Sequence, residues 1–190
     1  MTMTGPVAAL LDGGRLHLQH GPIDLIIGAD ADDAAGRQRA FAAAAARFDG
    51  LLDELVAELP LLRAEMTPTL PAPRGPVARR MAAAVRPHAG VFITAMAAVA
   101  GAVADEILAA MTAAVPLRRA YVNNGGDIAI HLAEGAYFTS AIAGLDGRGL
   151  GRIAVSARDG IGGIATSGAG GRSFSLGIAD SVTVLARCAA

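Results

Sequence analysis

The stretch from Arg119 to Leu132, RAYVNNGGDIAIHL, decides the fold, because it places two strand-like segments on either side of a glycine turn. Arg119–Asn123 and Asp127–Leu132 carry residues typical of β-strands. The intervening Asn-Gly pair is the strongest short signal for a hairpin, because a type I′ turn requires positive φ at both central residues. The stretch therefore predicts two strands joined by a tight turn.

The chain on the C-terminal side of this hairpin is also expected to form β-strands. Short strand-like segments are separated by glycine turns, and the stretch between the last two of them is rich in glycine. The expected strands are Tyr137–Ala143, Arg152–Ala157 and Ser181–Ala186.

The chain on the N-terminal side is mainly helical. Asp30, Asp32 and Asp33 supply N-cap and first-turn acids for a long helix, and Pro60 should end it. A proline-rich linker, 61–76, follows, and Pro76 can occupy the first position of the next helix. The expected helices are Ala34–Leu59, Val77–Val85 and Val91–Ala114, and an earlier hairpin of Leu16–His20 and Ile23–Ile27 should join the sheet.

Helices before residue 115 and strands after it predict an α+β fold, in which the N-terminal hairpin and helices pack on a mainly antiparallel sheet from the C-terminal half. The length of 190 residues fits a single domain, 1–190. The longest apolar run, Ala89–Ala104, is shorter than the roughly 20 residues that span a bilayer, so we expect a buried core helix and no membrane partner.

Composition and charge exclude several function classes. The 53% of hydrophobic residues excludes disorder. The net charge of −1 gives no reason to expect nucleic acid as a partner. All 16 basic residues are arginines, so no lysine can act as a base or as a P-loop ligand. Cys188 is the one cysteine, which leaves no internal disulfide and makes a reducing, cytoplasmic location the expectation.

The turn at Asn124, Gly125, Gly126 and Asp127 has two interpretations. It can be a plain hairpin turn, or its glycines can let a ligand phosphate approach the exposed backbone N–H groups while Asp127 orients a hydroxyl or a metal. It is neither a Walker loop, which needs a lysine, nor a dinucleotide-binding fingerprint.

A second glycine-rich segment, 160–173, contains Thr166, Ser167, Gly168 and Arg172. We expect a loop here, because so many glycines and hydroxyls cannot build a core, and loops of this length are commonly functional or disordered. Hydroxyls, free amides and one arginine suit an anionic ligand, whereas Ile164 indicates that the segment is packed. His17 and His20 straddle a turn, but their spacing is a weak metal signal.

Three segments together resemble the ApbE superfamily of flavin transferases. They are 94–105 (TAMAAVAGAVAD), 122–128 (VNNGGDI) and 164–184, which begins IATSG and ends DSVTV. The sequence is most similar to a branch of it, the UPF0280 family, to which 17–24 and 75–81 are also similar. The likeness covers nearly the whole chain.

The resemblance implies an ApbE-type α+β fold, with FAD or FMN as the cofactor, Mg²⁺ and transfer of FMN to a protein threonine. By position it makes Asn124, Gly125, Gly126, Asp127, Thr166, Ser167 and Gly168 candidate flavin-binding residues, to which the loop chemistry adds Arg172, and it makes Asp127 a candidate metal ligand. Three features of the transferases differ here. The family's Lys-Gly pair reads Ala100-Gly101, and the His that follows its Thr-Ser-Gly loop has no counterpart in 173–180 (SFSLGIAD). The family's metal-binding Asp and Thr would follow the last strand, beyond Ala190, where the sequence given ends.

Three functions stay open at this point. The first is binding, with or without catalysis, of an anionic nucleotide or flavin-type ligand in a cleft between the two glycine-rich loops. The second is a non-catalytic assembly module, for instance a homodimer through the small-residue helix face of Ala95, Ala98, Gly101 and Ala102. The third is an enzyme on an unrelated small substrate, because a fold does not determine a function.

Overall fold

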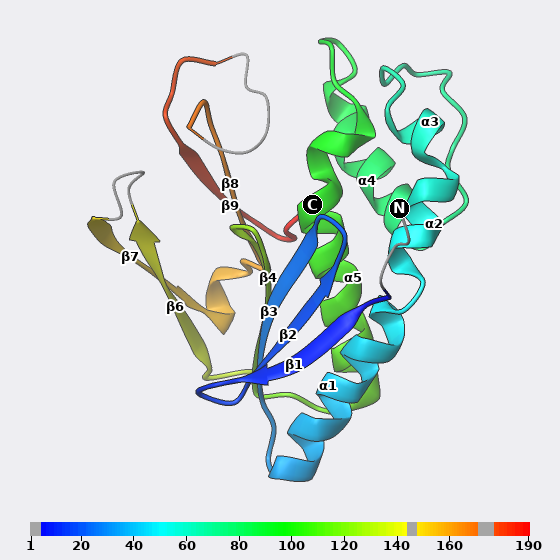
Figure 1. Ribbon diagram of the computed structural model, residues 1–190. Helices are drawn as coiled ribbons and strands as arrows, with labels where there is room; N and C mark the ends of the chain where they lie inside the picture. Colours follow the sequence, from blue (N-terminus) through cyan, green and yellow to red (C-terminus); the bar gives the residue numbers. More distant parts are fainter. Residues whose placement is uncertain (1–4, 144–147, 171–176) are drawn as a thin grey trace.

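The structure is a computed structural model that describes residues 5–143, 148–170 and 177–190. In these ranges an antiparallel sheet has the strand order β1-β2-β3-β4-β5-β8-β9, and β6 and β7 form a separate hairpin (Figure 1). The strands are β1 (Val7–Leu11), β2 (Arg15–His20), β3 (Ile23–Asp30), β4 (Arg119–Asn124), β5 (Asp127–Leu132), β6 (Tyr137–Ala143), β7 (Gly149–Ser156), β8 (Gly163–Ser167) and β9 (Val182–Ala186).

Helices cover one face of the large sheet. α1 lies along β2 and β3, and α5 lies along β4 and β5 and packs against α1 (Figure 1). The core between the layers is built from large apolar side chains that exclude water, among them Leu25, Ile27, Phe48, Ile107 and Met111. The helices are α1 (Ala34–Phe48), α2 (Leu51–Ala57), α3 (Leu59–Leu62), α4 (Pro76–Val85) and α5 (Val99–Ala114), with 3₁₀ turns η1 (Arg86–His88), η2 (Ala95–Ala98) and η3 (Ala157–Asp159).

The predicted α+β fold is therefore confirmed, and the N-terminal hairpin joins the same sheet as the later strands. Each of the strands predicted from the sequence is present, with ends that differ by up to three residues. The prediction omitted β1, which is short and largely exposed at one edge of the sheet.

The prediction of one continuous helix over 34–59 is wrong, because α1 ends at Phe48 and α2 begins at Leu51. Asp33 caps α1 as predicted, with its Oδ1 accepting the N–H of Gly36 at 2.5 Å. Gly50, however, adopts a left-handed φ of 74°, which breaks the helix and lets α2 start in a new direction. Pro60 also does not end the helical region, because it lies in the first turn of α3, where its missing N–H costs no hydrogen bond.

α4 begins as the sequence predicts, with Pro76 in its first turn. Its N-cap residue, Gly75, makes no side-chain cap hydrogen bond. Glu58, at the end of α2, accepts the backbone N–H groups of Arg74 and Gly75, both at 2.7 Å. These bonds hold the pKa of the Glu58 carboxyl below its usual value.

The apolar segment before β4 forms a core helix, although η2 and α5 begin only at Ala95, later than predicted. Ala95–Ala114 is long and apolar enough to cross a bilayer by length and composition, but half of it is buried inside the fold. A Cβ at Gly101 would overlap the carbonyl oxygen of Ala189, so the small-residue face packs at this position against the chain's own C-terminal segment. A homodimer through this face stays a prediction.

The glycine-rich stretch 160–173 is not all loop, which corrects the sequence-based expectation. β8 extends the sheet beside β5, and Ile164 is buried, so this segment does contribute to a core. Gly162 and Gly163 are required by packing, because a Cβ at either position would overlap the backbone of 187–189.

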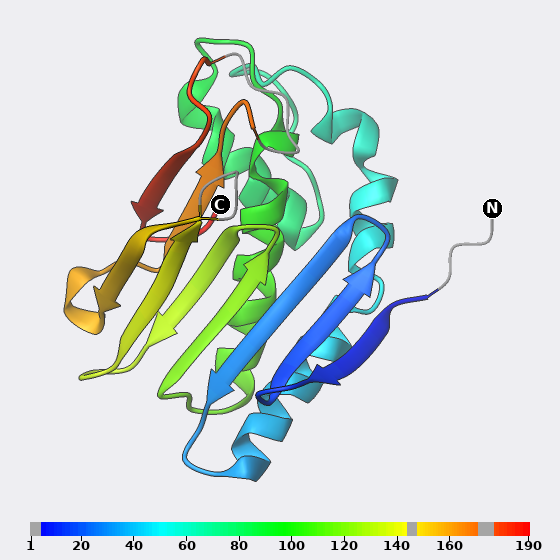
Figure 2. The same cartoon turned by 60° about the vertical axis from the view of Figure 1, so that its left-hand side comes forward.

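The β6–β7 hairpin lies on the sheet face opposite the helices (Figure 2). Ile128, Ile130 and Ile164 form a second, smaller core there, and partly buried side chains from the hairpin pack on it. The rings of Tyr121 and Phe138 meet with their centres 5.5 Å apart. The hairpin thus covers the middle of this face and leaves β1–β3 open on one side.

Candidate functional site

The Gly125-Gly126 turn joins β4 to β5 and projects into open space. Asn124 pairs with Asp127 across it, and φ is 65° at Gly125 and 111° at Gly126, as the predicted type I′ turn requires. A Cβ built on either glycine meets no atom within 4 Å. The backbone of this turn is therefore open to a ligand.

The two amides of the turn are not equivalent. The N–H of Gly126 donates to Oδ1 of Asn123 at 2.9 Å, so it already has an acceptor. Within the described residues the N–H of Gly125 has none. The expectation of free N–H groups at this turn therefore applies to Gly125.

Asn124 is a structural residue as well as a candidate for binding. Its side chain is buried on the helix side of the sheet, where Nδ2 donates to the carbonyl oxygen of Ala100 at 3.1 Å. This bond ties the turn to the first turn of α5.

Asp127 and Thr166 are 39 residues apart in the chain, and the structure brings them together. Asp127 Oδ1 accepts the backbone N–H of Thr166 at 3.2 Å, just beyond the point where β5 and β8 stop pairing. The Asp127 carboxyl is partly buried, and this desolvation raises its pKa, while the hydrogen bond from Thr166 acts in the opposite direction. The role of both residues in ligand binding stays a prediction.

The register of the strands separates the hydroxyls of this region onto two faces. Thr166 pairs with Thr183, and their Oγ1 atoms are 3.0 Å apart on the face opposite the helices. Because successive side chains alternate between faces, Ser167 points to the helix side, the side that Asp127 also takes through its pairing with Asn124. Asp127 therefore shares a face with the Ser167 hydroxyl and only the backbone of Thr166.

Gly168 serves the fold of the β8–β9 connection. A Cβ there would overlap the carbonyl of Asp180, so the two arms of the connection can approach only at a glycine. Arg172, the candidate counter-charge for an anionic ligand, lies outside the residues that the structure describes.

The histidine pair does not form a metal site. His17 faces away from the helices and contacts Asp24, with Nε2 and Oδ1 2.8 Å apart. His20 is on the other face and is buried. Over the described ranges no cluster of three or more His, Cys, Asp or Glu could hold a metal ion.

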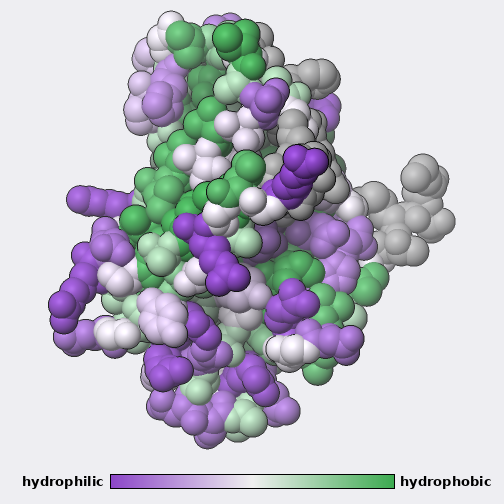
Figure 3. Space-filling model, turned by 90° about the vertical axis from the view of Figure 1, so that its left-hand side faces the viewer, coloured by the Kyte–Doolittle hydropathy of each residue, from purple (hydrophilic) through white to green (hydrophobic). Residues whose placement is uncertain are grey.

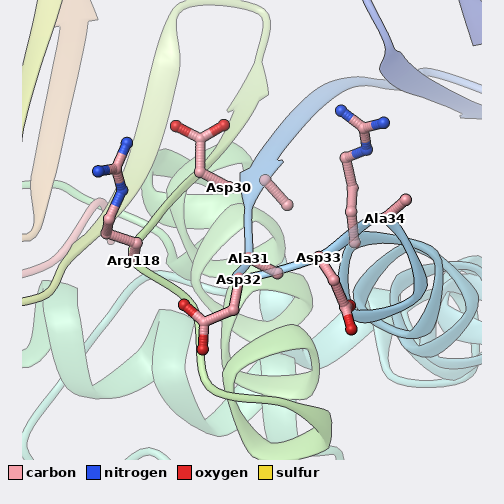
Figure 4. A pocket seen from close by; sticks show the side chains of 8 residues that line it. Asp30, Ala31, Asp32, Asp33, Ala34 and Arg118 are labelled. Atoms are coloured by element: carbon pink, nitrogen blue, oxygen red, sulfur yellow. The ribbon is translucent and has the colours of Figure 1, made fainter.

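Two hollows lie at the other end of the sheet. One, of about 530 Å³, surrounds the connection between β3 and α1. In Figure 4, Asp30 and Arg118 point to one side of this connection, whereas Asp32 and Asp33 point to the other. The second hollow, of about 370 Å³, lies beside it, around Gly28 and Tyr121. Arg37 lines both. The residues around each hollow come from separate segments of the chain, so no local pattern in the sequence indicates them.

The chain matches, over residues 7–190, the family model described as AbpE bacteria. It belongs to this ApbE-like family. No curated protein matches it. The match covers both glycine-rich segments, so the ApbE-like resemblance of the sequence is confirmed at the level of the family.

Proposed function

We propose that this ApbE-like chain binds an anionic nucleotide or flavin-type ligand where the Gly125-Gly126 turn meets the end of β8, and that it falls in the UPF0280 branch. One observation carries the proposal. The hydrogen bond from the N–H of Thr166 to Asp127 joins the two segments that resemble the flavin-binding segments of the superfamily.

The groups at this junction suit a nucleotide in their donor and acceptor chemistry. The open N–H of Gly125 and the exposed hydroxyl of Ser167 are donors for phosphate oxygens. The Asp127 carboxylate is an acceptor for a ribose or ribityl hydroxyl. FAD or FMN, when bound, would supply the phosphate, these hydroxyls and the redox-active ring, and Arg172 would balance the charge of the phosphate.

The Mg²⁺ site that the resemblance implies at Asp127 stays a prediction. Mg²⁺ requires near-octahedral oxygen coordination, commonly with one or two carboxylates and several waters. No cluster of three candidate side chains surrounds Asp127 in the described ranges, and one oxygen of its carboxylate is already bonded to the Thr166 amide. The proposal is therefore for ligand binding by backbone, hydroxyl and carboxylate groups.

Calorimetric titration of the full chain with FAD, FMN and ADP tests the proposal. We expect saturable binding of at least one of them, weakened tenfold or more in Asp127→Ala. Asp53→Ala is the matched control, because it removes an exposed carboxylate on α2 with the same change of charge. Absence of binding below millimolar concentration, or equal losses in both variants, would contradict the proposal.

A second candidate function, self-assembly, is favoured by the exposed edge strand β9. β9 lies at the end of the sheet, and Val182 and Val184 are each about half exposed on it. Figure 3 shows hydrophobic residues running across this side of the molecule. An apolar edge strand can pair with the same strand of a second copy and extend the sheet. Sedimentation should show a dimer that Val184→Lys converts to a monomer; a wild-type monomer at high concentration would exclude it.

A further inference from the structure

The second hollow, of about 370 Å³, lies on the sheet face opposite the helices, at the end remote from the Gly125-Gly126 turn. β4 links the two places, because Arg119 at its start lines the hollow and Asn124 at its end adjoins the turn. A volume of this size accommodates a small organic ligand. The lining combines arginines, aromatic rings and glycines, namely Gly13, Gly14, Arg15, Gly28, Arg37, Arg119, Tyr121, Tyr137 and Phe138 among others.

The arginines give the hollow an excess of positive charge. Arg119 is neutralised by Asp30, with 2.6 Å between Nη2 and Oδ2, and it also donates to the carbonyl oxygen of Tyr137 at 3.3 Å. The guanidinium groups of Arg15 and Arg37 have no hydrogen-bond or carboxylate partner in the described part of the chain. Two unpartnered guanidinium groups beside one hollow form a site suited to phosphate or carboxylate.

The glycines make room for the charged and aromatic groups. Arg37 reaches across to the β1–β2 turn, where its Nη1 lies 3.5 Å from the position of a Cβ on Gly14. On the floor of the hollow, the ring of Tyr121 occupies the space that a Cβ on Gly28 would need. Any larger residue at Gly28 would displace this ring.

The aromatic side chains offer a surface for a planar ring. The rings of Tyr121 and Phe138 pack against each other with an angle of 49° between their planes. Tyr137 is 66% exposed although it is a large aromatic residue, so its ring is free to stack on a ligand.

We infer that this hollow binds a small phosphorylated aromatic compound of mononucleotide size. Arg15 and Arg37 hold the phosphate, and the rings of Tyr121 and Tyr137 provide the surface on which the aromatic ring of the ligand stacks. The inference does not depend on the proposed function, since the two sites share no residue. A small ligand is favoured over nucleic acid, because the whole chain carries a net charge of −1 and so has no overall attraction for a polyanion.

The fluorescence of the protein reports on this hollow alone. The chain has no tryptophan, and its two tyrosines, Tyr121 and Tyr137, both line the hollow. We therefore propose to titrate the full chain with AMP, pyrophosphate and adenosine while following tyrosine emission, with N-acetyltyrosinamide as the correction for absorption by the probe. We expect saturable quenching by AMP, and binding at least tenfold weaker for pyrophosphate and for adenosine.

Variants locate the binding. Arg37→Ala and Arg15→Ala, both at exposed positions, should each weaken AMP binding about tenfold. Arg39→Ala, an exposed arginine on the same helix outside the hollow, and Asp127→Ala should leave it unchanged. The inference is overturned if AMP does not change the emission saturably, if Arg39→Ala weakens binding as much as Arg37→Ala, or if Asp127→Ala abolishes it. Equal affinity for pyrophosphate and AMP would overturn the role assigned to the ring.

Discussion

The side chain of Asp127 is partly buried and accepts one hydrogen bond. Its carboxyl is partly removed from water, which disfavours the charged form, and its Oδ1 accepts the N–H of Thr166. In the proposed site, this carboxylate would also accept a ligand hydroxyl. Asp127 is therefore the residue on which the proposed function depends most directly.

The raised pKa of Asp127 sets the sign of its pH dependence. A group whose pKa is higher in the folded state stabilises the protein below its unfolded pKa, and this contribution is lost as the pH rises through the folded value. Asp127→Asn keeps the acceptor oxygen without the charge, so we expect its stability relative to wild type to increase between pH 3 and pH 7. Asp127→Ala should lose ~1 kcal/mol, the size of one hydrogen bond.

Urea unfolding of the three proteins at both pH values checks this prediction. An Asp127→Asn protein whose stability relative to wild type falls as the pH rises would show that the carboxylate is favoured by its surroundings, against the burial described above.

Gly101 is the residue on which the packing of the C-terminal segment depends. A Cβ there would overlap the carbonyl oxygen of Ala189, which is backbone and cannot rotate away. We expect Gly101→Ala to destabilise the protein by about 1–3 kcal/mol, as overpacking does, despite the better helix propensity of alanine. Gly90→Ala is the control, because its Cβ would meet no atom within 4 Å and no positive φ is required. Thermal unfolding compares the two, and equal midpoints would contradict the close contact.

Among the secondary-structure elements, those that depend on a local sequence pattern could be predicted. The strands around Gly125-Gly126 and the first position of α4 follow from turn and cap chemistry that a few residues carry. β8 was not predicted, because its glycines are needed for contact with 187–189, a partner that no local pattern reveals. The break at Gly50 was missed for a similar reason, since the apolar stripe of α1 and α2 continues across it.

The chemistry of the candidate site could be predicted from the sequence, but its geometry could not. The chemistry of Asp127 and of the hydroxyl segment could be inferred from residue types, and the structure brings Asp127 and Thr166 together. The opposite faces of Thr166 and Ser167 depend on strand register, which a segment taken for a loop does not have. The arginine-lined hollow depends on five separate elements, β2, β3, α1, β4 and β6, that meet only in the fold.

Glu58 connects the end of α2 with the segment that leads into α4. Its carboxylate accepts two backbone N–H groups before α4, and these bonds lower its pKa. A lowered pKa gives stability that is present above the unfolded value, near 4.3, and lost as the pH falls through the folded one. Glu58→Ala should therefore cost about 1–2 kcal/mol at pH 7 and progressively less below pH 4. Chemical unfolding of wild type and variant against pH measures this, and a loss that does not depend on pH would contradict it.

In the whole molecule, the two proposed sites lie at opposite ends of the sheet and differ in their chemistry. One end carries open glycine backbone, a hydroxyl and a partly buried carboxyl, and the other carries free arginines and aromatic rings. Between them, the helix layer packs on one face of β4 and β5, and the β6–β7 hairpin packs on the other. The two sites are therefore expected to bind independently.

The central claim is that the Gly125-Gly126 turn and the end of β8 form one binding site. Amide chemical shifts of the isotopically labelled chain, followed during titration with FMN, test it most directly. We predict saturable shifts of the Gly125, Asp127, Thr166 and Ser167 amides with a single dissociation constant. If FMN leaves these four amides unshifted up to millimolar concentration, or shifts the two segments with different affinities, the claim is wrong.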